Sequence, residues 1–239
     1  MPRLLRFFML ICLVVATAAR ADTGYFLKEG AVNPAKLLPE PPGETCSETR
    51  TELDCLLRLQ ETRTPAEVAR AGAQAESVVP AFKDLFGPWF NEDNLPQTMK
   101  LLRKASREGK RGCDLAKQQF GRRRPQYVEP KIKPVLPGLT ESCYPSGHAV
   151  EATVVAAVLA AMVPEYKQVA AERAREIGWN RVVVGAHYPS DCTAGRVLGQ
   201  AVAQALLADA RFQAELEKAK AELRPLKSQH FRPGRVECH

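Results

Sequence analysis

Apolar residues recur at helical spacing through most of the chain. Between residues 48 and 62, leucines at positions 53, 56, 57 and 59 fall on one face of a helix. Thr64-Pro65 is a helix start, with the threonine as cap, and we expect this helix to run to about Phe86, where Gly87-Pro88 stops it. Further helices are predicted over residues 95–120, 149–163, 167–184, 190–207 and 212–223.

The longest apolar run of the mature chain lies at residues 149–163. It is rich in alanine and valine, contains Glu151 and ends before Pro164, which is typical of a helix buried in a protein core and not of a membrane span. No segment alternates in the manner of a β-strand, and the chain has no internal repeat. We therefore predict an all-α fold, a compact multi-helix bundle around this central helix, with no stable membrane insertion.

The N-terminus has the pattern of a secretory signal peptide. Arg3 and Arg6 precede an apolar run over residues 7–15, and Ala19-Arg20-Ala21 is a small-residue cleavage site. An uncleaved anchor is disfavoured because a spanning helix needs about 20 apolar residues. We expect a periplasmic or secreted protein after cleavage near Ala21. The predicted organisation is a signal peptide (1–21), an extended N-terminal arm (22–46), a helical domain (47–224) and a loose C-terminal tail (225–239).

The net charge suits small anionic substrates. It is +7 for the whole chain, and it falls to +4 without the three arginines of the signal peptide. Basic residues are spread along the chain, which is not the footprint of a nucleic-acid-binding protein. The one dense run is Arg122-Arg123-Arg124, of which we assign Arg122 and Arg123 to solvent or to the steering of substrate.

The cysteines predict disulfide bonds. Cys12 leaves with the signal peptide, and an even number of cysteines in an exported chain indicates pairing. Cys46 with Cys55 is a plausible local pair, and Cys143 and Cys192 are expected to lie close in space because each adjoins a motif. The full connectivity stays open among the six that remain: Cys46, Cys55, Cys113, Cys143, Cys192 and Cys238.

Three separated motifs carry the chemistry. They are Lys117-x6-Arg124-Pro125, Pro145-Ser146-Gly147-His148 and Arg181-x5-His187-x3-Asp191. The first offers two cations, the second a glycine-flanked turn with a hydroxyl and an imidazole, and the third a guanidinium with a histidine and a carboxylate. An oxyanion that is attacked on one side and protonated on the other requires this set of groups.

Two of the motifs predict specific local geometry. Ser146 and Gly147 open a helix, whose free N–H groups attract an anion, and His148 in the first turn can protonate a leaving oxygen. Asp191 can orient His187 by accepting a hydrogen bond from one ring nitrogen, which leaves the other nitrogen to attack phosphorus. Each motif alone has an ordinary structural explanation, namely a helix cap, a satisfied histidine or a solvated cation. Only the ordered set points to a phosphate site.

The ordered set resembles the signature of bacterial class A non-specific acid phosphatases, in the phosphatidic-acid phosphatase type 2 and vanadium haloperoxidase superfamily. The likeness extends to Ala81–Gly87, Gly178–His187 and Phe212–Lys220. Asn180 departs from the family pattern, which has serine there, and we expect it to modulate activity without being catalytic.

The resemblance implies a phosphomonoesterase that needs no metal or other cofactor. His187 would form a phosphohistidine, Asp191 would orient it, and His148 would protonate the leaving alcohol and then activate water. The phosphoryl oxygens would be held by Lys117, Arg124, Ser146, Gly147 and Arg181.

Other classes are weighed against this interpretation. A vanadate-dependent peroxidase would use nearly the same residues, a membrane lipid phosphatase would add several spanning helices, and a periplasmic anion-binding protein would not need both histidines. A cysteine-dependent phosphatase requires Cys-x5-Arg, whereas Ala149 stands six residues after Cys143. The partners expected are small phosphorylated substrates. Substrate preference and homo-oligomerisation stay open.

Overall fold

The computed structural model of the chain describes residues 24–136 and 139–230, so the predicted signal peptide lies outside the described residues. The all-α prediction is confirmed for these ranges, where the extended chain forms only an isolated bridge between Arg123 and Ser142. No helix within the ranges is both long and apolar enough to cross a membrane. The helices are α1 (Pro34–Leu37), α2 (Ser47–Thr62), α3 (Pro65–Ala73), α4 (Lys83–Phe86), α5 (Pro96–Phe120), α6 (Pro125–Val128), α7 (Gly147–Met162), α8 (Lys167–Val183), α9 (Pro189–Ala208) and α10 (Ala210–His230), with 3-10 turns at Val79–Phe82 and Pro164–Tyr166.

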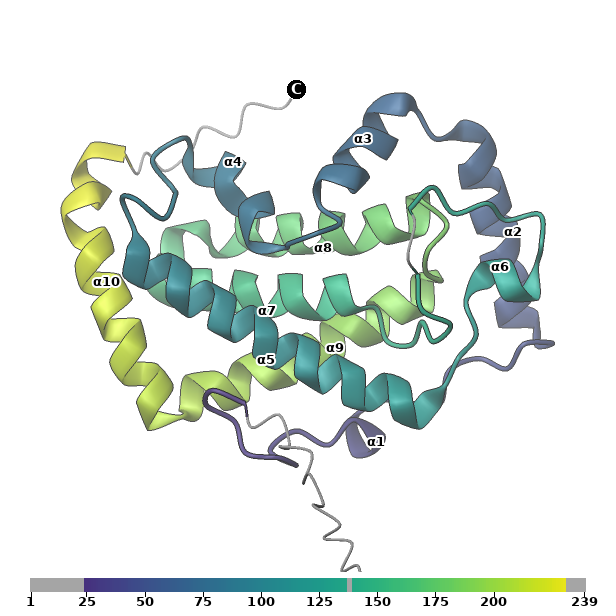
Figure 1. The fold of residues 1–239 in the computed structure, drawn as a ribbon, viewed down its shortest axis with the longest axis horizontal. Coiled ribbons are helices and arrows are strands. Elements are labelled where there is room, and N and C mark those ends of the chain that lie inside the picture. The colour runs from purple at the N-terminus through teal and green to yellow at the C-terminus, as the bar shows by residue number, and fades with distance from the viewer. Residues whose placement is uncertain (1–23, 137–138, 231–239) are drawn as a thin grey trace, which may run out of the picture.

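Helix α7 forms the centre of the bundle, as the apolar run predicts. It packs against α5, α8 and α9, while α10 crosses one end of the bundle (Figure 1). Glycines allow α9 to approach α7 closely, because a Cβ atom on Gly195 would lie 2.7 Å from the carbonyl oxygen of Ser146 and one on Gly199 would lie 2.7 Å from that of Val150. Larger residues would push the two helices apart. This contact places the start of α9 beside the start of α7.

The segment before α2 lies against α5 and α10. Phe26 packs edge-on against Phe212 of α10, with ring centroids 5.1 Å apart, and its backbone N–H donates to Glu108 of α5 at 2.7 Å. Tyr144, next to the second motif, donates from its hydroxyl to the carbonyl of Pro39 at 2.8 Å. The segment thus contacts the middle of α5, the α10 helix and the residues just before α7 through side chains and backbone together.

The single helix predicted from Thr64 to Phe86 is wrong, because it breaks after Ala73. The chain is irregular from Gln74 to Val78 and resumes as a 3-10 turn followed by α4. Pro80 rules out one continuous helix through residue 80, since its ring cannot be accommodated in a helix interior and it has no N–H to donate, but α3 already ends seven residues before it. The predicted start, with Thr64 as cap and Pro65 at the first helical position, is confirmed, and the structure adds a capping box between Thr64 and Glu67. The break matters because it exposes backbone carbonyls beside the second motif.

Two helix ends also differ from prediction. The α9 helix begins at Pro189, before the predicted cap Ser190-Asp191, and the Asp191 carboxylate accepts from the Tyr188 N–H at 3.1 Å. The α10 helix continues through Pro225 to His230, where the sequence pattern indicated a loose tail from residue 225. A proline inside a helix forfeits one hydrogen bond, and here the helix tolerates that loss.

The expected disulfides are not formed, because Cys46, Cys55, Cys113, Cys143 and Cys192 are all free. Cys46 and Cys55 lie nine residues apart along α2, a rise of about 13 Å, beyond the reach of a disulfide. Cys143 and Cys192 do share one buried cluster, as expected. Their thiols contact separate backbone carbonyls, that of Arg123 at 3.3 Å and that of Gly178 at 3.1 Å. Cys12 and Cys238 lie outside the described residues.

Candidate active site

The three motifs converge at one end of the bundle. The C-terminal ends of α5 and α8 and the N-terminal ends of α7 and α9 lie there together (Figure 1). Ser146, the residue before α7, donates its N–H to the carbonyl of Asp191 at 3.0 Å, which joins the second motif to the third. Arg124 is held by backbone pairing, since its N–H donates to the carbonyl of Glu141 at 3.1 Å.

The His187–Asp191 pair has the geometry that the spacing predicts. The Nδ1 atom of His187 lies 3.1 Å from Oδ2 of Asp191, and both side chains are buried. On the other side of the ring, Nη1 of Arg124 lies 3.2 Å from Nε2. Because a carboxylate accepts and a guanidinium only donates, we assign the proton of the neutral imidazole to Nδ1 and a lone pair to Nε2.

Burial sets the ionisation of this pair. It lowers the pKa of His187 to about 4, and this effect outweighs the hydrogen bond and the charge of Asp191, which act in the opposite direction. Burial raises the pKa of Asp191, but the hydrogen bond and charge of His187 and the charge of Arg122 outweigh it, and the pKa is lowered. A neutral imidazole beside a carboxylate is therefore the state of the pair above mildly acidic pH.

Two buried side chains present polar atoms without partners. Arg181 donates from Nη2 to the carbonyl of Ala71, whereas its Nε and Nη1 atoms have no hydrogen-bond partner among the described residues. The hydroxyl of Ser146 likewise has none, apart from a weak interaction with the Cys192 thiol. Arg181 is 1% exposed and Ser146 is fully buried. Orphaned donors of this kind are costly in a folded protein and call for a ligand.

Gly147 has no packing reason to be glycine. A Cβ atom at this position would meet only the Cys113 sulfur, at an ordinary contact distance of 3.6 Å. The Gly147 N–H stands in the first turn of α7, where N–H groups have no partner within the helix. An anion that approaches this backbone closely would exclude a side chain, which gives a physical reason for glycine here.

His148 is positioned by the break after α3. Its Nε2 atom lies 3.0 Å from the carbonyl oxygen of Ala75. Burial and the charge of Arg181 lower the pKa of His148 to about 4, while hydrogen bonds to the backbone at Ala75 and Gln74 act to raise it. The imidazole is therefore held between an acceptor, which favours its protonated form, and a cation, which opposes it.

The two cations of the first motif differ in how firmly they are held. Arg124 is 3% exposed and donates to the carbonyls of Thr140 and Ala186. Lys117, one turn before the end of α5, forms no ion pair with any described residue, and its charge acts on both His148 and His187. Arg124 is thus fixed in place, whereas the ammonium group of Lys117 is a charge available to a ligand.

The assignment of Arg122 to solvent or steering is wrong. Its guanidinium is buried, donates to Asp191 Oδ1 at 2.7 Å and to Glu52 at 2.9 Å, and lies over the Tyr188 ring at 3.8 Å. Arg123 does face solvent, with a loose pair to Glu44 at 3.5 Å. In a run of arginines, the sequence does not show which one is buried and which is exposed. Nor does it show that Glu52, 70 residues earlier on α2, pairs with Arg122.

The Asn180 side chain is not one of the buried donors without a partner. Its side chain donates to Oε1 of Gln74 at 2.8 Å, and both residues are buried. The pair ties α8 to the broken segment that contacts His148. Asn180 therefore acts through the wall of the site, and the sequence offered no signal for Gln74.

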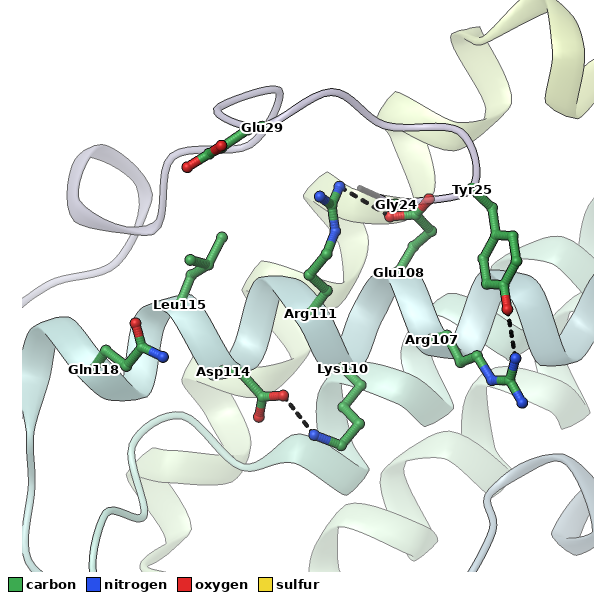
Figure 2. Close-up of a pocket in the computed structure, with 10 residues that line it drawn as sticks. All are labelled: Gly24, Tyr25, Glu29, Arg107, Glu108, Lys110, Arg111, Asp114, Leu115 and Gln118. Carbon is green, nitrogen blue, oxygen red and sulfur yellow. Dashed lines mark hydrogen bonds and ion pairs between the residues drawn. The ribbon is translucent and has the colours of Figure 1, made fainter. Parts of the chain in front are cut away.

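A separate pocket of about 920 Å³ lies along the outer face of α5 (Figure 2). Four of its charged groups form two ion pairs: Lys110 with Asp114 at 2.5 Å, and Arg111 with Glu108 at 3.2 Å. None of the residues that the three motifs specify lines it. Among the described residues there is also no group of three or more His, Cys, Asp or Glu side chains arranged to hold a metal ion.

The fold and the site define an all-α protein with a buried imidazole–carboxylate pair close to cationic donors. The family model of the PAP2 superfamily matches residues 110–214, which include all three motifs. The non-specific acid phosphatase of Providencia stuartii is 31% identical, with 85% of this chain and 86% of that protein covered. That of Salmonella typhi is 29% identical, with 92% of each covered. The chain therefore belongs to the PAP2 superfamily, as an enzyme of the non-specific acid phosphatase family.

A lipid A 1-phosphatase of Rhizobium etli is also similar, at 33% identity, but over only 36% of this chain and 39% of that protein. The likeness to the non-specific acid phosphatases instead extends through nearly the whole chain. It therefore includes α2, which carries Glu52, and the broken segment after α3.

Proposed function

We propose that this enzyme hydrolyses phosphomonoesters in two steps, through a phosphohistidine at His187 and without a metal ion. The observation that carries the proposal is the set of buried, unpartnered donors on Arg181 and Ser146. Both residues are joined through the backbone to a neutral His187 and its partner Asp191, since the His187 N–H donates to the Arg181 carbonyl at 3.2 Å and the Ser146 N–H donates to the Asp191 carbonyl at 3.0 Å. A phosphoryl group supplies the acceptor oxygens that these donors lack. It also supplies the electrophile that a neutral imidazole attacks.

In the first step, Nε2 of His187 attacks phosphorus and the bond to the ester oxygen breaks. The leaving oxygen takes the proton of His148, so that an alcohol departs. In the second step a water molecule gives a proton to His148 and attacks phosphorus, and the phosphorus–nitrogen bond breaks. Inorganic phosphate leaves, and both histidines return to their starting states.

The cations stabilise the phosphoryl oxygens in both steps. Arg181 offers Nε and Nη1, the hydroxyl of Ser146 and the N–H of Gly147 add neutral donors, and Lys117 adds a charge from α5. Nη1 of Arg124 now contacts Nε2 of His187, and we propose that it turns to a phosphoryl oxygen when substrate binds, which frees the lone pair for attack. Preorganised donors of this kind act most strongly where water is excluded.

We also propose that the enzyme is exported and acts on small phosphorylated substrates in the periplasm or outside the cell. The pattern of residues 1–21 supports export, and the positive net charge of the remaining chain supports anionic substrates. N-terminal sequencing of protein from the periplasmic fraction tests this. A mature terminus near Asp22 is expected, and intact Met1 in the cytoplasm would contradict export.

The central experiment measures p-nitrophenyl phosphate hydrolysis by purified residues 22–239, with and without EDTA. We expect turnover that survives chelation and inhibition by vanadate, which occupies the phosphate site. His187→Ala should abolish turnover, because no other group can form the intermediate. Alkaline quenching with labelled substrate should trap label on the wild type alone, since phosphohistidine survives alkali.

Arg123→Gln is the matched control, because Arg123 lies on the surface beside the same motif. Full activity in the His187 variant would exclude the covalent route. Complete loss of activity on chelation, restored by added metal, would show that a metal takes part.

A further inference from the structure

We propose that Glu52 and Arg122 form a positioning pair that extends from α2 to Asp191 and fixes the orientation of His187. The proposal rests on the proposed function, since it concerns how the nucleophile is prepared. Neither residue contacts His187, and neither belongs to the motif positions that bind phosphate. Their role is inferred from four hydrogen-bonded links: His187 to Asp191, Asp191 to Arg122, Arg122 to Glu52, and Glu52 to the start of α9.

The guanidinium of Arg122 is held on every side. Nη1 donates to Asp191 Oδ1 and to the Ser190 hydroxyl, each at 2.7 Å, and Nη2 donates to Glu52 at 2.9 Å. Its plane rests on the Tyr188 ring, 3.8 Å from the centroid. Only 4% of the side chain is exposed. A planar fork fixed in this way gives the Asp191 carboxylate a single orientation.

Both oxygens of Asp191 are used, and for different purposes. Oδ2 accepts from His187 Nδ1 and from the Tyr188 N–H, each at 3.1 Å, while Oδ1 accepts from Arg122. Without Arg122 the carboxylate could rotate about its own axis, and a rotated carboxylate would release the Nδ1 proton. The imidazole could then adopt the other tautomer, whose Nε2 bears hydrogen and cannot attack.

Glu52 balances the charge of Arg122 and anchors it. Its carboxylate accepts from the Ser190 N–H at 2.6 Å and from the Ser190 hydroxyl at 2.9 Å, at the N-terminus of α9. Glu52 therefore holds the turn that carries the His187–Asp191 pair, and it favours that helix end electrostatically. It lines a surface groove of about 420 Å³, so water can solvate a substitution there.

The pair also has a consequence for pH dependence. The charge of Arg122 helps to lower the pKa of Asp191, against the burial that raises it. Four groups on neighbouring elements shift the pKa of Asp191 or of His187. They are Arg122, Arg124 and Cys143, from the segments between α5 and α7, and Lys117, from α5. Arg122 is the only one of these described groups that forms an ion pair with Asp191 besides His187 itself.

The test compares Arg122→Gln, Arg122→Lys and Glu52→Gln with the control Arg123→Gln. We expect Arg122→Gln to lower kcat by about 10- to 100-fold, as loss of an orienting partner does, with little change in KM because no phosphate contact is lost. The acidic limb of its pH profile should move to higher pH. Arg122→Lys should recover part of the loss, Glu52→Gln should lower kcat several-fold, and Arg123→Gln should match the wild type.

A second measurement needs no substrate. In protein labelled with ¹⁵N-histidine, His187 should show one tautomer in the wild type, with the proton on Nδ1, and a mixture in Arg122→Gln. A loss of activity with unchanged pH profile and tautomer would mean that Arg122 only supports the fold, which overturns the proposal. Unchanged kcat overturns it as well.

The two proposals fail in different ways. If the wild type does not hydrolyse phosphomonoesters, the proposed function fails while the tautomer measurement still decides the role of Arg122. If the wild type is active and every variant of the pair matches it, the function stands and the positioning role is lost. If Arg122→Gln does not fold, Glu52→Gln decides by the same pH profile and tautomer, because its side chain reaches solvent.

Discussion

The two sides of His187 differ in how far their polar atoms are satisfied. Behind the ring, Asp191, Arg122, Glu52 and Ser190 are joined by short hydrogen bonds. On the side of α7 and α8, buried atoms of Ser146 and Arg181 lack partners among the described residues. The polar atoms of the first group already have their hydrogen bonds. The buried atoms of the second group destabilise the folded protein until an anion supplies the missing acceptors. In the proposed mechanism, the contrast separates residues that hold the nucleophile from residues that hold substrate.

The largest effect should come from Asp191→Asn, on the satisfied side. An amide can hold the imidazole in the wrong tautomer, so kcat should fall by about 10³- to 10⁴-fold. Vanadate binding, measured by calorimetry, should stay close to that of the wild type, because Asp191 contacts no phosphoryl oxygen in the proposed mechanism. A comparable loss of vanadate binding would show that the two sides are not separable.

Arg181→Gln, on the unsatisfied side, should act on both binding and turnover. The change removes the donors that await an anion, so kcat/KM should fall by about 10²- to 10³-fold and vanadate binding should weaken with it. Steady-state kinetics and calorimetry together give this result. If vanadate bound to the variant as tightly as to the wild type, the unpartnered atoms of Arg181 would not be the phosphate site.

The pH dependence should distinguish the free enzyme from its complex. In the proposed mechanism His148 must start protonated. Burial and Arg181 lower its pKa to about 4, so its proton is lost as pH rises through this value. Thus kcat/KM should decline from mildly acidic to alkaline pH. A bound phosphate dianion opposes Arg181, so the alkaline limb of kcat should lie higher by about one pH unit. Coincident limbs measured on p-nitrophenyl phosphate would contradict the role of His148.

The two serines of the site offer the most sensitive comparison. Ser146→Ala removes an unpartnered hydroxyl, so activity should fall by about 10-fold while the free energy of unfolding stays the same or rises. Ser190→Ala removes bonds to Arg122 and Glu52, so the free energy of unfolding should fall by about 1 kcal/mol. Urea unfolding and kcat/KM, measured on both variants, check the pattern. Equal destabilisation by both changes would contradict the contrast.

Local sequence features predicted the elements with strong, self-contained signals. The α5 and α7 helices carry long periodic or apolar runs, and Thr64 carries its own capping box, so their existence follows from neighbouring residues alone. The prediction of one helix from Thr64 to Phe86 is wrong, because the periodic pattern of apolar residues cannot carry a helix through Pro80. The predicted disulfide between Cys46 and Cys55 is wrong because the α2 helix holds the two residues apart, whereas a flexible loop could have brought them together.

By itself, the sequence determined the all-α class, the three motifs and the candidate groups on which the proposed mechanism rests. These follow from residue type and spacing within short segments. Only the tertiary structure decided that Arg122 turns inward to Asp191 while Arg123 turns out, that Glu52 on α2 completes the network, and that the break after α3 brings Ala75 to His148. The physical reason is that burial and pairing arise from contacts between distant segments of the chain. Two adjacent arginines are chemically identical, so the sequence around them does not indicate which one will pack inward.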